Sequence, residues 1–205
     1  MRVLIACEFS GRIREMFKSK GHDAWSCDFL PTEAEGNHIQ GDCLDAIKDD
    51  QWDMIIMHPP CTALSVSGNS TYAKGKPKHH ERITAIEWTM ALWELAKQHA
   101  PMVCMENPVG VLPIKATQFI QPWQFGHNES KKTGLGLYGL QPLQATKVMP
   151  MPMCNYRENQ TPSGQNKLGP SLDRWKLRSK TYPGIASAMA DQWGGGVLDE
   201  SISSL

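Results

Sequence analysis

The segment "MIIMHPPCTALSVSG", residues 54–68, joins a run of apolar residues to two prolines and a cysteine. Four apolar residues that follow Asp53 predict a buried strand, and Pro59 and Pro60 end it because proline has no backbone N–H to give to a sheet. The thiol of Cys61 therefore stands just past the end of a strand. A cysteine in this place is either a small buried side chain or a nucleophile held at the rim of a sheet.

Strand-like and helical patterns alternate on both sides of this segment. The runs that predict strands are residues 2–7, 22–28, 38–42, 52–58 and 102–107. The patterns that predict helices are residues 12–21, 44–50, 81–99 and 184–193. In the longest helix the expected buried stripe is Ile83, Ile86, Met90 and Trp93. This alternation predicts an α/β fold: a mostly parallel sheet with helices on both faces and ligands at the carboxyl ends of the strands.

The second half of the chain is less regular. Seven prolines between residues 113 and 181 cut it into short pieces, with one apolar strand expected in "GLGLYGL", residues 134–140. We expect a single domain over residues 1–205, a loop-rich, Pro-rich segment at about 140–182, and a frayed tail at 197–205.

Composition excludes several classes of protein. With 205 residues, 40% of them hydrophobic and 20% charged, the chain is long enough to bury a core. It has neither a signal-peptide pattern at its start nor a run of eighteen apolar residues, so we expect a soluble cytoplasmic protein with no membrane role.

The cysteines do not form a metal-binding or disulfide pattern. None is paired in a CxxC or Cys/His spacing, so the sequence predicts free thiols and no metal site. The six are Cys7, Cys27, Cys43, Cys61, Cys104 and Cys154. All except Cys61 and Cys154 are expected to be small buried side chains.

The formal net charge is zero, so any binding to nucleic acid must use local basic patches. The first candidate patch is Lys74, Lys76, Lys78, His79, His80 and Arg82. The second is Lys167, Arg174, Lys176, Arg178 and Lys180. Either patch is equally well explained as a solvated loop.

Two reactive side chains follow neighbouring strands. Cys61 and Glu106 stand at or after the ends of the fourth and fifth predicted strands, so in a parallel sheet they should converge on one pocket. A thiolate beside a carboxyl group suits a cytosine ring. Attack at carbon 6 becomes easier when the carboxyl group hydrogen-bonds ring nitrogen 3, and carbon 5 then becomes nucleophilic towards a methyl donor.

A methyl donor would need its own binding site at the same edge of the sheet. The turn Phe9–Ser10–Gly11 follows the first strand and could hold the methionine part of the donor. Asp28 follows the second strand and could bind ribose hydroxyls, and Asp42 follows the third and could bind the adenine amino group.

"PPCTALSVSG", residues 59–68, resembles the catalytic motif of the cytosine-C5 DNA methyltransferases, usually written PPCQxFSxxG. Both prolines, the cysteine, Ser65 and Gly68 match in register. Thr62 replaces the family's Gln, and Leu64 replaces its Phe.

Four further segments resemble motifs of that family in the family's order. "MENPV" (105–109) resembles the ENV motif with Pro108 as a departure, and "CEFSG" (7–11) resembles DLFAGxGG without its later glycines. "ESKKTGLGLYG" (129–139) aligns with the family's QxRxR motif, and its lysines keep part of the positive charge of that motif. "KTYPGIASAMADQW" (180–193) resembles the last motif, a helix that closes the methionine pocket.

The resemblance implies a Rossmann-like fold that uses S-adenosylmethionine to methylate carbon 5 of a cytosine flipped out of DNA. The catalytic residues that it implies are Cys61, Glu106 and Asn107. The expected cofactor-binding residues are Phe9, Ser10, Gly11, Asp28, Asp42 and Pro59. The expected substrate-binding residues are Pro60, Ser65, Lys131, Lys132, Lys76 and Arg82.

The chain is short for this family. Only about 45 residues, from Gly139 to Pro183, lie where family members that read DNA sequence carry a large recognition region. The resemblance is therefore to the short phage- or prophage-type members, with DNA as the expected substrate and RNA or a free cytosine nucleotide as a weaker alternative.

Two other classes of function stay open on the sequence alone. One is an amino-methyltransferase with a [DN]PP[YFW] motif, although His58 and Cys61 occupy its Asp/Asn and aromatic positions. The other is a binding protein that kept the fold and lost turnover.

Overall fold

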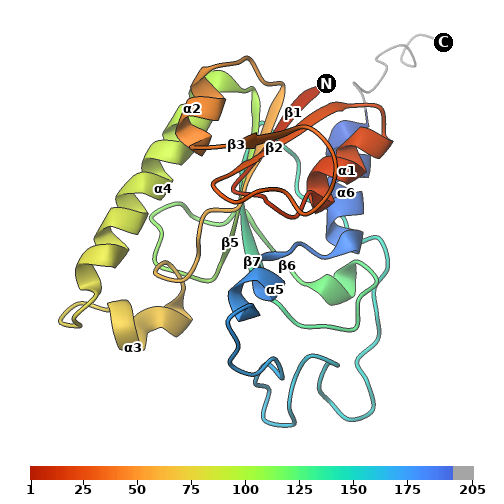
Figure 1. Cartoon of the computed structure of the whole chain (residues 1–205). Helices are drawn as coiled ribbons and strands as arrows, with labels where there is room; N and C mark the ends of the chain where they lie inside the picture. The colour runs from red at the N-terminus through yellow and green to blue at the C-terminus, as the bar shows by residue number, and fades with distance from the viewer. Residues whose placement is uncertain (196–205) are drawn as a thin grey trace.

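The computed structural model describes residues 1–195 and forms a seven-stranded sheet between two layers of helices (Figure 1). The tail expected to fray, residues 197–205, lies outside the described residues. The strands are β1 (Arg2–Ala6), β2 (Asp23–Asp28), β3 (His38–Gln40), β4 (Met54–Met57), β5 (Met102–Pro108), β6 (Gln118–Ile120) and β7 (Thr133–Tyr138). The five strands of the first half of the chain and the "GLGLYGL" strand are confirmed, whereas β6 was not predicted.

The sheet has the order β3-β2-β1-β4-β5-β7-β6. All pairs from β3 to β5 are parallel, and β7 runs antiparallel to both β5 and β6. The predicted α/β class with a mostly parallel sheet is confirmed. The strand order reverses between β1 and β4, and the carboxyl ends of strands at such a switch point are where open α/β sheets bind ligands.

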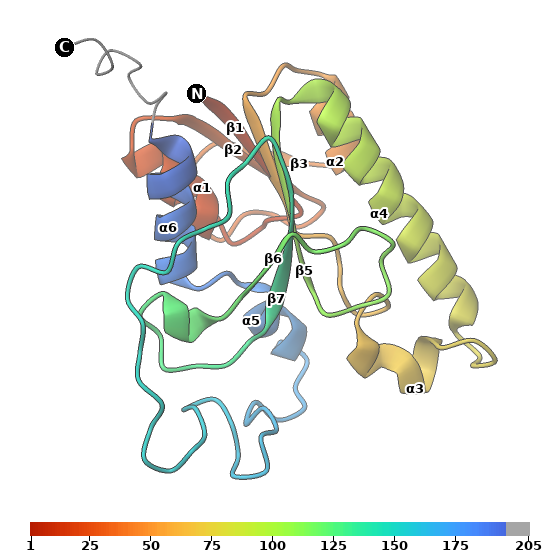
Figure 2. The same ribbon diagram turned by 180° about the vertical axis from the view of Figure 1, so that it is seen from behind.

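Helices cover both faces, as predicted. The helices are α1 (Arg12–Ser19), α2 (Cys43–Lys48), α3 (Asn69–Tyr72), α4 (His79–His99), α5 (Arg174–Ser179) and α6 (Pro183–Gly194), with 3-10 turns η1 (Val66–Gly68) and η2 (Pro122–Gln124). Helices α1 and α6 pack on one face of the sheet, and α2 and α4 pack on the other (Figures 1 and 2). None of the helices within residues 1–195 has the length and apolarity needed to cross a bilayer.

The apolar stripe predicted for α4 is wrong apart from Trp93. The residues that α4 buries are Arg82, Thr89, Leu92, Trp93 and Ala96. Ile83 is 42% exposed, because the first turns of α4 extend past the carboxyl ends of the strands towards α3 (Figure 2) and have no sheet to pack against.

The segment between β7 and α6 is irregular, as its prolines predicted, apart from the short helix α5. Helix α5 lies near the carboxyl end of β5 and the amino end of β7 (Figure 1). The Pro-rich segment thus returns to the edge of the sheet where the predicted reactive residues stand.

Candidate functional site

The carboxyl end of β4 places Cys61 at the rim of the sheet. All four residues of β4 are buried, and Pro59, which follows, is buried as well. Pro60 and Cys61 are exposed. The apolar strand is fixed between its neighbours, so the two prolines carry the chain out of the core and leave the thiol accessible.

Glu106, on the adjacent strand β5, has the most strongly shifted pKa among the acidic residues of the site. Desolvation alone would raise its pKa, but Lys131, His58 and Thr133 together lower the pKa of Glu106 to about 2. His58 Nδ1 lies 3.2 Å from Oε2 of Glu106. Glu106 is therefore a carboxylate at neutral pH, held by positive charge and hydrogen bonds.

The thiol of Cys61 lies within the electrostatic reach of Glu106. Surrounding protein and then the Glu106 charge raise the pKa of Cys61, while the charges of Lys131 and Arg178 lower it. Cys61 and Glu106, predicted to converge, are thus close enough to interact electrostatically. The thiol is protonated in the free protein near pH 7, and added positive charge would activate it.

Lys131, a predicted substrate-binding residue in the segment before β7, lowers the pKa of both Cys61 and Glu106 through its charge. Its Nζ donates a hydrogen bond to the backbone oxygen of Arg178 in α5, at 2.9 Å. The contact links the basic helix α5 to the group of Cys61, Glu106 and Lys131. Arg178 was recognised in the sequence only as part of a basic patch.

Arg82 and Ser65 hold the loop that follows Cys61. Arg82 is buried, and its guanidinium donates to the backbone oxygens of Ala63 (2.7 Å) and Ser65 (3.1 Å) and to the side chain of Asn69 (2.8 Å). Ser65 also pairs with Gly110 in an isolated bridge. Arg82 was predicted to contact substrate; in the structure its donors bind the loop that follows Cys61 and hold it in place.

The lysines of the first basic patch do face solvent. Lys74, Lys76 and Lys78 are exposed in the turn between α3 and α4, and Lys78 Nζ lies 3.1 Å from Glu81. Pro60 lines a groove together with residues from the first turns of α4, including His80 and Trp88. Lys76 and Pro60 are therefore both exposed and open to a ligand.

The turn after β1 is built around Glu8, which the sequence did not single out. The buried Glu8 carboxylate accepts hydrogen bonds from the backbone N–H of Ile13 (2.8 Å) and from Ser10 Oγ (3.3 Å). Gly11 precedes α1 with φ 69°, a left-handed conformation that suits glycine. Phe9 is buried, and the ring of Trp175 in α5 lies against it at 6.1 Å between centroids.

Arg14 holds the loop after β2 in place. Its side chain is fully buried, and its guanidinium donates to Ser26 Oγ (2.8 Å) and to the backbone oxygen of Ala34 (2.7 Å). A second contact runs from the backbone N–H of Glu33 to the oxygen of Phe9 at 2.8 Å. This loop is thereby fixed beside the predicted donor turn.

Asp28 and Asp42 stand at the same edge, and both are half-buried. Oδ1 of Asp28 accepts from the N–H of Leu30, and Oδ1 of Asp42 accepts from the N–H of Leu44 as the N-cap of α2, each at 2.9 Å. Burial raises the pKa of Asp28. Both aspartates therefore have a local structural role, and each remains partly open to a ligand.

Two predicted site residues lie apart from Cys61. Successive side chains of a strand point to opposite faces, so Asn107 faces the α4 side while Glu106 faces the other. Lys132 places its Nζ 4.6 Å from the ring centroid of Phe119, beside the Asn107 pocket. The structure does not bring Asn107 or Lys132 together with Cys61 and Glu106.

Three of the cysteines that were expected only to be small buried side chains lie close together, after β1, in β2 and at the start of α2. Cys7 Sγ lies 3.8 Å from Cys43 Sγ, and Cys43 Sγ lies 3.5 Å from the backbone oxygen of Cys27. Hydrogen bonds from Cys27 and Cys7 lower the pKa of Cys43. Across residues 1–195 no three His, Cys, Asp or Glu side chains are arranged to hold a metal ion.

Comparison with known proteins finds likeness to solved structures. No family model and no curated protein matches the sequence. A solved structure of a methyltransferase from Entamoeba histolytica aligns with 15% identity and a TM-score of 0.46, covering 78% of this chain. The chain spans 60% of the length of that methyltransferase.

Proposed function

We propose that this protein transfers a methyl group from S-adenosylmethionine to carbon 5 of cytosine in DNA, through a covalent bond to Cys61. The observation that carries the proposal is that an accessible thiol and the Glu106 carboxylate lie at the carboxyl ends of adjacent strands, within electrostatic reach of the Lys131 ammonium just before β7. The order of the sequence motifs around these residues supports the same reaction.

The protein's residues act first on the cytosine ring. Because Glu106 is ionised, it can hold a proton taken from solvent on ring nitrogen 3 in a charge-assisted hydrogen bond. The ring then accepts the sulfur of Cys61 at carbon 6, the thiol proton leaves to solvent, and electron density moves to carbon 5. His58, which is hydrogen-bonded to Glu106, fixes the orientation of the Glu106 carboxylate.

The carboxyl ends of β1, β2 and β3 carry groups that fit S-adenosylmethionine. Half-buried Asp28 and Asp42 offer carboxylate oxygens for ribose hydroxyls and an amino group, and the fixed turn at Phe9 and Gly11 borders the same edge. When bound, S-adenosylmethionine supplies an electrophilic methyl group. The protein itself must hold the cytosine that is bonded to Cys61 so that carbon 5 of the ring faces that edge of the sheet.

Release of the product reverses the addition. After methyl transfer, the proton on carbon 5 leaves to a base, the ring double bond re-forms, and the sulfur of Cys61 is expelled as a thiolate. A fluorine on carbon 5 cannot leave in this way, so a 5-fluorocytosine substrate should remain bonded to Cys61.

DNA is the substrate that the exposed charges favour. Lys74, Lys76 and Lys78 follow the Cys61 loop and face solvent, where they could contact phosphates beside a flipped base. The basic residues of α5 approach the pocket from the other side through the contact of Lys131 with Arg178.

Trapping with 5-fluorocytosine tests this proposal. The protein and S-adenosylmethionine are incubated with 5-fluorocytosine in duplex DNA, single-stranded DNA, RNA or dCMP, and a denaturation-resistant adduct is sought by mass spectrometry. We expect an adduct with DNA that disappears in Cys61→Ser and persists in Cys154→Ser, a control for the other exposed cysteine. Methylation of cytosine by Cys61→Ser at the parent rate would overturn the assignment of the nucleophile.

A further inference from the structure

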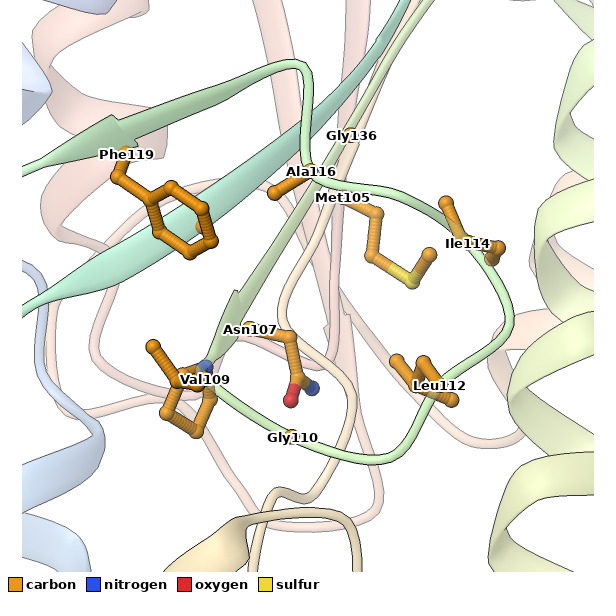
Figure 3. A pocket seen from close by; sticks show the side chains of 11 residues that line it. Met105, Asn107, Val109, Gly110, Leu112, Ile114, Ala116, Phe119 and Gly136 are labelled. Carbon is orange, nitrogen blue, oxygen red and sulfur yellow. The ribbon is translucent and has the colours of Figure 1, made fainter.

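A second pocket lies on the face of β5 opposite Glu106. The chain from Pro108 to Ala116 leaves the end of β5 and curves round a cavity of about 130 Å³, into which the side chain of Asn107 points (Figure 3). Gly134 and Gly136 of β7 form part of the wall, where the absence of side chains leaves room beside the strand. None of the chemistry proposed for Cys61 uses this cavity.

The amide of Asn107 has no hydrogen-bond partner. The residue is only 7% exposed, and within residues 1–195 neither its oxygen nor its nitrogen makes a hydrogen bond. Leaving such groups buried and unpaired destabilises a protein, so nearly all buried polar atoms in native structures are paired. A ligand in the cavity that accepts from the amide nitrogen and donates to the amide oxygen would remove that cost.

The cavity has the size and walls for one six-membered ring. A cavity of roughly 150 Å³ with apolar walls takes up benzene in another protein, so about 130 Å³ suits a single planar ring. Met105, Leu112 and Ile114 provide apolar walls around Asn107 (Figure 3). The ligand is therefore a monocycle with an adjacent donor and acceptor on one edge.

Two lysines neighbour the lining residues of the cavity. Lys132 lies over the ring of Phe119, a lining residue, and exposed Lys115 stands between the lining residues Ile114 and Ala116. Neither lysine forms an ion pair with another residue of the range 1–195. An anionic group attached to the ring would find a partner there.

We infer that this cavity is a binding site for a pyrimidine nucleotide, with the base against Asn107 and the phosphate near Lys132 and Lys115. Cytosine, thymine and uracil each carry a neighbouring donor and acceptor that match a carboxamide. The nucleotide comes either from solution or from a nucleic acid strand. The inference does not depend on methyl transfer, because it involves neither Cys61 nor Glu106.

Titration with dTMP, followed by NMR without any methyl donor, tests the site. We expect amide shifts to change in residues 109–119, and ribose 5-phosphate to cause much smaller changes. In Asn107→Leu, which keeps the size of the side chain and removes both polar atoms, dTMP affinity should fall about tenfold or more. The variant should unfold at the same temperature as the parent or higher, because an unpaired buried amide has been removed.

Controls separate this site from the proposed reaction and identify the source of the nucleotide. Cys61→Ser and the exposed-amide control Asn166→Leu should bind dTMP as the parent does. Tighter binding of a short oligo-dT than of dTMP would assign the site to a nucleic acid strand, and equal binding would assign it to free nucleotides. Unchanged dTMP affinity in Asn107→Leu, shifts confined to the Cys61 loop, or no binding by the parent would each overturn the inference.

Discussion

His58 Nδ1 lies 3.2 Å from Glu106 Oε2, so the residue that follows β4 is paired with the carboxylate of β5. Both side chains are largely buried, and Nε2 of His58 is buried without a hydrogen-bond partner within residues 1–195. The pair places a fixed negative charge beside the thiol of Cys61. Three of the predictions below concern this charge or the loop around it.

Replacing Glu106 should change how stability depends on pH. The pKa of Glu106 is about 2 in the folded protein against an ordinary value of 4.5, so its ionisation stabilises the fold above about pH 4.5, and this stabilisation is lost as the pH falls towards 2. Glu106→Gln should lower the free energy of unfolding by about 3 kcal/mol at pH 6, and the difference from the parent should shrink below pH 4.5. Chemical denaturation across this pH range measures it.

The matched control for that experiment is Glu87→Gln, which changes an exposed carboxylate on α4. Its free energy of unfolding should follow that of the parent at every pH. A constant difference between Glu106→Gln and the parent from pH 6 to pH 2 would show that the Glu106 carboxylate is not held by Lys131 and His58.

The same charge should govern the reactivity of Cys61. Because the Glu106 carboxylate raises the pKa of Cys61 and Lys131 lowers it, Glu106→Gln should increase the rate of alkylation by iodoacetamide at pH 8, and Lys131→Met should decrease it. Peptide mass spectrometry follows each cysteine separately. Cys154 is exposed in all of these proteins and serves as the internal reference, so equal changes at Cys154 would contradict a local effect of Glu106.

Arg82 should matter to the stability of the Cys61 loop. Arg82→Met keeps the length of the side chain but leaves the backbone oxygens of Ala63 and Ser65 without their donor, which should destabilise the protein by about 3 kcal/mol. Arg174→Met, at a half-buried arginine of α5, is the control. If Arg82→Met were as stable as the parent but bound DNA more weakly, the sequence-based prediction of a substrate contact would hold after all.

The sequence predicted those parts of the structure that depend on local pattern. Strand β4 and its neighbours are apolar runs bounded by turns, and a parallel sheet brings their carboxyl ends to one edge, so Cys61 and Glu106 could be paired before the fold was known. The α4 stripe failed because burial on a long helix depends on where the sheet ends, which the helix's own sequence does not record.

The missed features are contacts between distant segments. The pairing of His58 with Glu106 joins residues 48 positions apart. The contact of Trp175 with Phe9 joins an irregular segment to the first turn of the fold, and helix propensity carries no information about it. Asn107 was assigned to the catalytic group by its neighbour in the motif, although alternation along a strand turns neighbouring side chains to opposite faces.

Asp42 tests the proposed donor site, and its structural role requires a paired experiment. Asp42→Ala removes both the carboxylate and the N-cap of α2, whose loss typically costs about 1 kcal/mol of stability. Asp42→Ser removes the charge but keeps an oxygen that can cap the helix. If Asp42 accepts a hydrogen bond from the adenine amino group, calorimetry should show that both variants bind S-adenosylmethionine more weakly, by about 0.5 to 3 kcal/mol. Parent-like binding in Asp42→Ser with loss only in Asp42→Ala would mean that Asp42 serves the helix and not the donor, and absence of binding to the folded parent would remove the methyltransferase proposal itself.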